Sequence, residues 1–123
     1  MGPGKILIVD DEADFREMLA EVCKMNGYCV NCANSGMDAL HRLKEEAYSL
    51  IIVDYQMPEM DGIEFIRQVR KRWDLLPVIA VSAIDVGKLF IDAGANLFLE
   101  KPFNYKVLEK EIAMILKSNN PES

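Results

Sequence analysis

The sequence lacks the features that usually identify membrane, exported and nucleic-acid-binding proteins. No apolar run approaches the length needed to cross a bilayer, and the first residues lack the charged-then-apolar pattern of a signal peptide. Basic residues are in the minority, 14 against 20 acidic residues, for a net charge of −6. Binding of nucleic acid needs clustered Lys and Arg for phosphate contacts. We therefore expect a cytoplasmic protein that neither inserts into a membrane nor binds nucleic acid directly.

Cysteine and histidine are too scarce to indicate a redox or metal centre of their own. The chain has three cysteines and one histidine, and without an export signal we expect the cysteines to be reduced. Cys29 and Cys32 form a Cys-x-x-Cys, but they fall in a predicted strand, where positions three apart face opposite sides. We interpret both as packing residues, and His41 as a surface residue of a helix.

What the chain does contain is a strict alternation of short apolar runs and longer segments of helical period. The apolar runs cover residues 6–9, 28–32, 50–53, 78–81 and 97–99, and the helical segments cover residues 15–22, 39–43, 63–70, 86–93 and 107–115. The first, third and fourth runs are continuously apolar, as strands buried on both faces must be. Five βα units predict an α/β fold with a parallel sheet and helices on both of its faces.

Residues typical of helix ends support this alternation. Ser35 and Asn104 are suited to be N-caps, while Gly27 and Gly94 are suited to end the helices before them. No linker or internal repeat interrupts the pattern. We therefore expect one domain over residues 1–123, with its core at about 5–117 and a flexible tail at 118–123.

Polar residues follow the apolar runs at the points where the predicted strands end. Asp10 and Asp11 follow the first run, Asp54 the third, Ser82 the fourth, and Lys101 stands two residues past the fifth. In open α/β sheets, binding sites lie at the carboxyl ends of the strands. The sequence therefore predicts a site built from these residues at one edge of the sheet.

The charges of this site predict a divalent cation. Three carboxylates close together repel one another, and hard cations such as Mg²⁺ take oxygen ligands. Three carboxylates, Lys101 and one Mg²⁺ sum to zero formal charge. Phosphorylation of one carboxylate adds about one negative charge, which the cation and Lys101 could hold. The set is therefore suited to phosphoryl transfer, which needs a nucleophile in line and charge stabilisation.

The sequence resembles the receiver domains of response regulators, from Lys5 to about Lys117. The resemblance rests on four segments, which are residues 8–12 (Ile-Val-Asp-Asp-Glu), 53–62 (Val-Asp-Tyr-Gln-Met-Pro-Glu-Met-Asp-Gly), 81–83 (Val-Ser-Ala) and 100–103 (Glu-Lys-Pro-Phe). It implies a flavodoxin-like, doubly wound (βα)5 fold with the strand order 2-1-3-4-5. That order puts the topological switch point between the first and third strands.

The resemblance also implies a role for each residue of the site. Asp54 resembles the phosphoacceptor, and Lys101 the cation that binds the phosphoryl group. Asp11 resembles the direct ligand of Mg²⁺ (or of Mn²⁺ in its place), Asp10 a ligand that acts largely through water, and the backbone carbonyl of Gln56 completes the metal shell. The chain would be no enzyme beyond its own phosphorylation and dephosphorylation.

Further roles implied by the resemblance concern the response to phosphorylation. Ser82 is similar to a hydroxyl that moves toward the phosphoryl group, and Phe98 to an aromatic residue that fills the vacated space. The side chains of Gln56 and Ile84 occupy positions that control water attack, so an apolar Ile84 favours a long-lived phosphoryl group. The Lys101–Pro102 bond is similar to one that is cis in the family.

The resemblance implies partners but leaves several alternatives open. The donor would be a sensor histidine kinase or a histidine phosphotransfer protein, the downstream protein is unknown, and the chain would be a monomer or weak dimer. It could be a free shuttle, a relay intermediate or part of a larger regulator. The stretch from Ser82 to Lys101 is shorter than is usual in the family, which puts the choice of partner through that face in question.

Two functions of other classes are weighed against this one. A flavodoxin-like electron carrier needs a Ser, Thr and Gly loop after the first strand to hold a phosphate, whereas Asp10, Asp11 and Glu12 stand there. A hydrolase that forms an aspartyl-phosphate needs a second acid two residues after Asp54, where Gln56 stands. Both alternatives are disfavoured.

Overall fold

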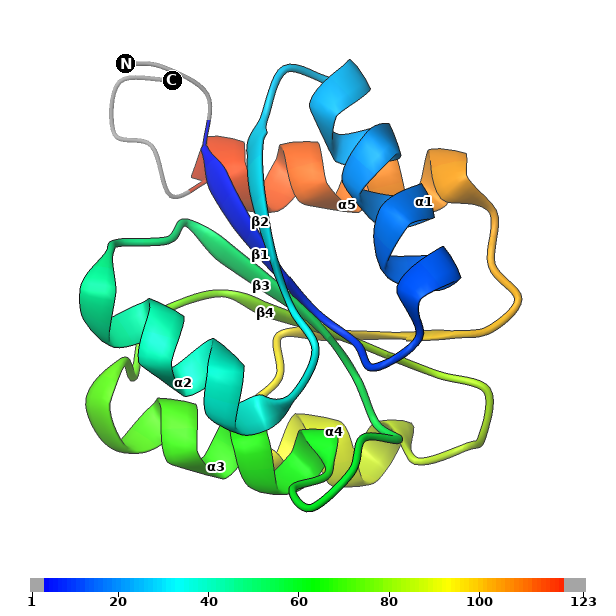
Figure 1. The fold of residues 1–123 in the computed structure, drawn as a ribbon. Helices are drawn as coiled ribbons and strands as arrows, with labels where there is room; N and C mark the ends of the chain where they lie inside the picture. The colour runs from blue at the N-terminus through cyan, green and yellow to red at the C-terminus, as the bar shows by residue number, and fades with distance from the viewer. Residues whose placement is uncertain (1–3, 119–123) are drawn as a thin grey trace.

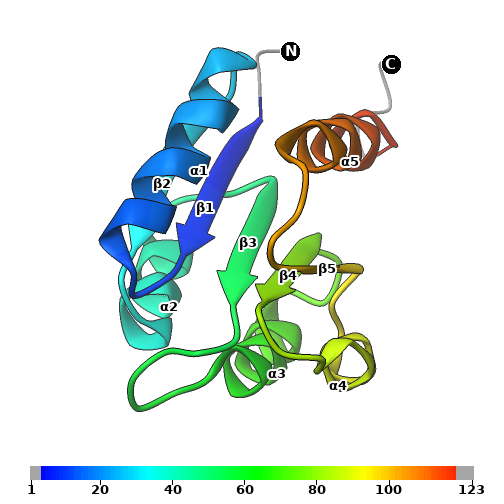
Figure 2. The same ribbon diagram turned by 90° about the vertical axis from the view of Figure 1, so that its right-hand side faces the viewer.

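The computed structural model describes residues 4–118. Five strands within this range form one parallel sheet. The strands are β1 (Lys5–Val9), β2 (Cys29–Ala33), β3 (Leu50–Asp54), β4 (Val78–Ser82) and β5 (Leu97–Glu100). Their order in the sheet is β2-β1-β3-β4-β5, as predicted. The arrowheads of β1, β3 and β4 point to the same edge of the sheet (Figure 2). The predicted flavodoxin-like α/β fold is confirmed.

Five helices connect the strands and cover both faces of the sheet. They are α1 (Ala13–Met25), α2 (Gly36–Glu45), α3 (Gly62–Arg72), α4 (Gly87–Ala93) and α5 (Tyr105–Ser118). Helices α1 and α5 lie on one face, and α2, α3 and α4 on the other (Figure 1). The expected tail lies, apart from its first residue, outside the described residues. None of the helices that the structure describes is long and apolar enough to span a membrane.

The apolar runs become strands because they can bury side chains on both faces. Every residue of β3 and β4 is buried, while β2 and β5 at the edges are partly exposed. Side chains alternate along β1, so that Leu7 and Val9 pack toward α2, α3 and α4, whereas Ile6 and Ile8 pack toward α1 and α5. The two resulting cores hold the central strands rigidly, and with them the side chains that follow at their carboxyl ends.

The helix ends form as the local sequence predicts. The side chain of Ser35 accepts a hydrogen bond from the backbone N–H of Asp38, at 3.1 Å, and so caps α2. Asn104 accepts one from the backbone N–H of Lys106, at 2.8 Å, before α5. Gly94 ends α4 with a φ of 121°, a left-handed conformation that glycine adopts without the strain of a Cβ.

One of the two predicted packing cysteines does not pack. Cys23, Cys29 and Cys32 are free; Cys23 is a buried residue of α1, whereas Cys29 is exposed on the edge strand β2, so its interpretation as a packing residue is wrong. Cys32 packs against the core below α1 and α5. His41 is exposed on α2. These residues form no redox or metal centre among the residues described.

Arg70 ties together the chain at the amino ends of β4 and β5. Its guanidinium donates hydrogen bonds to the carbonyl oxygens of Trp73, Leu76 and Gly94, at 2.7–3.0 Å, and to the side chain of Asn96, at 3.1 Å. Arg70, Lys71 and Arg72 form a basic run in the last turn of α3. The structure shows a half-buried side chain of Arg70 that joins α3 to the end of α4.

A second polar network lies at the amino end of β1. Glu46 pairs with the ammonium of Lys5, at 2.6 Å, and accepts hydrogen bonds from the amide of Asn31 and the hydroxyl of Tyr48. Asn31 also donates to Tyr48. Every polar group named here has a partner, so this edge of the sheet is electrostatically satisfied.

Candidate functional site

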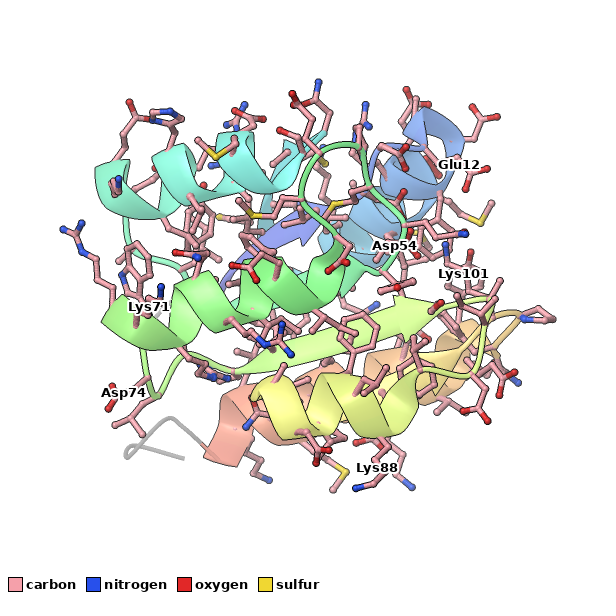
Figure 3. All side chains as sticks on the ribbon, turned by 90° about the horizontal axis from the view of Figure 1, so that it is seen from below. Glu12, Asp54, Lys71, Asp74, Lys88 and Lys101 are labelled. Atoms are coloured by element: carbon pink, nitrogen blue, oxygen red, sulfur yellow. The ribbon has the colours of Figure 1, made fainter. Side chains whose placement is uncertain are left out.

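Three carboxylates meet at the carboxyl ends of β1 and β3. Asp54 is the last residue of β3, while Asp10 and Asp11 follow β1 directly. Because β1 and β3 are neighbours, one oxygen of each carboxylate lies within 4.8 Å of those of the other two. Asp11 and Asp54 line a cavity of about 840 Å³, which Lys101 also reaches. Figure 3 shows Asp54 and Lys101 side by side at this edge of the sheet, with Glu12 nearby.

Asp10 is the most deeply buried of the three carboxylates, with 1% of its surface exposed. Its Oδ1 accepts a hydrogen bond from the backbone N–H of Glu12, at 2.9 Å. Its Oδ2 has no hydrogen-bond partner among the described residues. Burial, together with the nearby carboxylate of Asp54, raises the pKa of Asp10 from 3.8 to about 6. A buried carboxylate oxygen of this kind is stabilised by a cation.

Asp54 is held on both of its oxygens. Its Oδ2 accepts a hydrogen bond from the backbone N–H of Gln56, at 3.0 Å, and its Oδ1 lies 3.1 Å from the ammonium of Lys101. The residue is 7% exposed, and its side chain opens onto the cavity. The carboxylate is thus fixed in orientation and still accessible to a small reactant.

Gly62 is a residue of the site whose role the sequence did not reveal. It begins α3 and donates a hydrogen bond from its backbone N–H to the carbonyl oxygen of Tyr55, at 2.9 Å. A Cβ at this position would overlap the carbonyl oxygen of Asp54. Glycine therefore lets α3 start directly against the backbone of Asp54. The Asp61-Gly62 pair before a helix was the available signal, since Asp61 also caps α3.

Lys101 stands where β5 leads into α5, and several groups fix its position. Its ammonium lies 3.1 Å from Asp54, 3.7 Å from Asp10 and 3.7 Å from the ring centre of Phe15. Its backbone N–H donates to the carbonyl oxygen of Ser82, at 2.8 Å. The Lys101–Pro102 bond is cis, as the resemblance implied. The sequence did not predict the contact with Phe15, because helical spacing indicated only that this residue begins the apolar pattern of a helix.

Ser82 ends β4, Ile84 follows it two residues later, and Phe98 lies in β5. Ser82 is 1% exposed, and its hydroxyl oxygen accepts a hydrogen bond from the backbone N–H of Ile84, at 3.1 Å. The ring of Phe98 stacks on Phe90 of α4, with 5.8 Å between the ring centres. A Cβ on Gly87 would press into the ring of Phe98. The Ile84 side chain is 43% exposed at the surface after β4.

The residues present fit a divalent cation. The site brings three carboxylates together with one lysine, which leaves a formal charge of −2 when all four groups are ionised. The Oδ2 of Asp10 has no hydrogen bond among the described residues, and its ion-pair contact with Lys101 is long, at 3.7 Å, so this buried oxygen favours a further positive group. Oxygen donors without nitrogen or sulfur favour Mg²⁺, which keeps several of its waters and needs few carboxylates. Asp10, Asp11 and Asp54 are therefore the residues suited to hold it.

Comparisons with known proteins agree with this geometry. Residues 6–113 match the family described as "Response regulator receiver domain". "Response regulator MprA" of Mycobacterium leprae is 36% identical over 121 residues, which cover 96% of this chain. This chain spans about half of that relative, 53% of its length.

Solved structures are similar over nearly the whole chain. The chemotaxis response regulator CheY4 of Vibrio cholerae is 30% identical, with a TM-score of 0.86 over 92% of this chain and 98% of that one. The receiver domain of Francisella response regulator 1452 is 28% identical, with a TM-score of 0.90 over 95% and 99% of the two chains. The strand order and the acidic edge of the sheet thus occur in a fold shared with receivers.

Proposed function

Because the chain belongs to the response regulator receiver domain family, we propose that it accepts a phosphoryl group on Asp54. The donor is the phosphohistidine of a sensor histidine kinase or of a histidine phosphotransfer protein, met in the cytoplasm. The observation that carries the proposal is the position of Asp54, which faces an open cavity between Lys101 and two further carboxylates. The hydrogen bond that Asp54 accepts from the backbone N–H of Gln56 orients its carboxylate.

In the proposed transfer, one oxygen of Asp54 attacks the phosphorus in line with the bond to the donor. The phosphorus–nitrogen bond of the phosphohistidine breaks, and its electron pair returns to the imidazole, which leaves as the free side chain. Lys101 holds an oxygen of the transferred group as charge builds on it. Asp10, Asp11, Asp54 and the backbone carbonyl of Gln56 would hold Mg²⁺, or Mn²⁺ in its place, which would supply the remaining neutralisation.

The response to phosphorylation involves Ser82 and Phe98. The Ser82 hydroxyl can leave its present partner, the N–H of Ile84, to donate to a phosphoryl oxygen. Phe98 lies between Phe90 and Gly87, so its ring is coupled to the beginning of α4. Movement of these residues changes the surface near α4, which presents a new face to an unidentified downstream protein. We propose that the chain acts as a signalling switch, as a monomer or weak dimer.

Ile84 and Gln56 tune the lifetime of the phosphoryl group. Both side chains are exposed beside the site, where they can obstruct or admit the attacking water. Because Ile84 is apolar, Ile84→Asn is expected to speed dephosphorylation about two- to fivefold, by lowering the barrier by about 0.4–1 kcal/mol. The decay of the phosphorylated form after removal of the donor measures this. An unchanged decay rate would show that Ile84 does not control the lifetime of the phosphoryl group.

The proposed function is tested by intact mass after incubation with Mg²⁺ and acetyl phosphate. The wild-type protein is expected to gain one phosphoryl group, and Asp54→Asn none. Asp14→Asn is the matched control, because Asp14 is an exposed carboxylate on α1, and it is expected to behave as the wild type. A gain by Asp54→Asn, or no gain by any of the three, would contradict the proposal.

A further inference from the structure

The ammonium of Lys101 lies against the face of an aromatic ring. Its nitrogen is 3.7 Å from the ring centre of Phe15, and 3.1 Å from the nearer oxygen of Asp54. The nearest oxygen of Asp10 is 3.7 Å away. Both carboxylates are buried, so the lysine is enclosed by two anions and the negative face of a π-system. Contacts between a cation and a ring are strongest where both are shielded from water.

The ring of Phe15 is itself held in place by other aromatic side chains. Phe103 meets it edge to face, with 6.3 Å between ring centres and 83° between ring planes. Tyr105 meets Phe103 in turn, at 5.6 Å and 65°. The hydroxyl of Tyr105 contacts the sulfur of Met18, at 2.7 Å, one turn of α1 beyond Phe15. The side chains of Phe15, Phe103, Tyr105 and Met18 thus form a continuous row of contacts that runs from α1 to the start of α5 and returns to α1.

This arrangement goes beyond what packing of a helix requires. The core below α1 is filled by Leu19, Ala20 and Cys23, which are buried, whereas Phe15 remains half-buried at the edge of the site. An aliphatic residue at position 15 could cover the same apolar surface. Only an aromatic ring offers a cation a negatively polarised face.

We propose that Phe15 is a positioning residue that fixes the Lys101 ammonium for phosphoryl transfer to Asp54. This inference rests on the proposed function. Lysine has a long, flexible stem, and holding its ammonium in one place costs conformational entropy. The ring of Phe15 restrains it without adding a hydrogen-bond acceptor that would compete with the phosphoryl oxygens. The edge contacts of Phe103 and Tyr105 keep the ring oriented toward Lys101.

The contact itself is tested by NMR, without any phosphorylation. Protons over the centre of a ring are shielded, so the Lys101 Hε protons are expected upfield of those of exposed lysines such as Lys88. Phe15→Leu is expected to abolish the upfield displacement, and Phe15→Tyr to retain it. An ordinary position of these protons in the wild type would overturn the inference at its first step.

The role in transfer is tested with acetyl phosphate, which needs no docking surface for a partner protein. Phe15→Leu is expected to lower the rate of phosphorylation about fivefold, as the loss of one cation–π contact would. Phe15→Tyr is expected to restore most of the wild-type rate. Tyr28→Leu is the matched control, because Tyr28 is a half-buried ring of the same core beyond the opposite end of α1, and it is expected to leave the rate unchanged.

The outcomes separate this inference from the function on which it rests. Equal rates for the wild type and Phe15→Leu, or an equal fall in Tyr28→Leu, would overturn the positioning role and leave phosphorylation of Asp54 standing. If the wild type gains no phosphoryl group while the Lys101 protons are displaced by the ring, the proposed function fails and the contact stands. Loss of rate in Phe15→Leu with rescue in Phe15→Tyr supports the inference.

Discussion

The charged groups at the amino ends of the strands (the amino edge) differ from those at the carboxyl ends (the carboxyl edge) in how many partners they have. At the amino ends of the strands, the guanidinium of Arg70 reaches three carbonyl oxygens and one amide, and Glu46 has three partners. At the carboxyl ends, Asp10 is buried with an oxygen that lacks a hydrogen bond among the described residues. Figure 3 shows the edges apart, with Lys71 and Asp74 at one and Asp54 and Lys101 at the other.

This difference indicates that the polar groups of the amino edge stabilise the fold, whereas those of the carboxyl edge are there to bind a ligand. Satisfied polar groups stabilise a fold, whereas buried carboxylates without partners destabilise it until a ligand arrives. Loss of a side chain should therefore lower stability at the amino edge. At the carboxyl edge, loss of a carboxylate should raise the stability of the metal-free protein and abolish binding of the divalent cation.

The largest effect is expected from Arg70. Arg70→Met keeps the apolar stem and removes every hydrogen bond of the guanidinium, so three carbonyl oxygens each lose a hydrogen bond. We expect the free energy of unfolding to fall by about 2–4 kcal/mol, measured by urea denaturation. Lys71→Met, at the exposed neighbouring position, is the control and should change it by less than about 0.5 kcal/mol. Equal effects of the two variants would refute the assigned role of Arg70.

A smaller effect of opposite sign is expected from Asp10→Asn. The pKa of Asp10 is raised in the folded protein to about 6, from 3.8, so the folded state binds the proton more tightly than the unfolded state does. Its contribution to stability is therefore gained as the pH falls through about 6 toward 4, and is absent at pH 7. In metal-free buffer at pH 7, Asp10→Asn should raise the free energy of unfolding by about 1–2 kcal/mol.

The pH profile and Mg²⁺ make this prediction sharper. As the pH falls from 7 to 5, the free energy of unfolding of the wild type should rise relative to that of Asp10→Asn, so the stability advantage of the variant narrows. Mg²⁺ should raise the melting temperature of the wild type, by mass action on the folded state, and should leave Asp10→Asn nearly unchanged. If Asp10→Asn were less stable than the wild type in metal-free buffer, the claim that the carboxyl edge lowers the stability of the metal-free protein would be wrong.

The smallest effect is expected from Lys5, although it makes the shortest ion pair at the amino edge. Lys5 and Glu46 face solvent, where ion pairs contribute little and are screened by salt. Lys5→Met should therefore lower stability far less than Arg70→Met, and the difference from the wild type should vanish at high salt. A loss equal to that of Arg70→Met would show that exposure does not distinguish the two networks.

Much of the carboxyl edge could be predicted from the sequence. Continuous apolar runs could only be buried strands, and the polar residues that follow them had to meet where parallel strands end. Asp10, Asp11, Asp54 and Lys101 are therefore brought together as the pattern indicated. The strand order came from the resemblance to receivers, because periodicity does not specify which strands are neighbours.

What the sequence did not reveal depends on contacts between distant segments. Phe15 fits a helical apolar pattern whether it faces the core or Lys101, and 86 positions separate the two. Arg70 resembles its exposed neighbours until the chain near Gly94 is placed beside it. The need for glycine at position 62 arises from the backbone of Asp54, which only the folded chain brings into contact.

The central claim is that Asp54, among three neighbouring carboxylates, is the one that carries the phosphoryl group. Borohydride reduces an acyl phosphate to an alcohol and leaves free carboxylates unchanged, so peptide mass spectrometry after reduction locates the phosphorylated residue. With acetyl phosphate and Mg²⁺, we expect the reduced residue at position 54 alone, and none when a chelator replaces Mg²⁺. Reduction at Asp10 or Asp11, or at Asp54 without a divalent cation, would contradict the account.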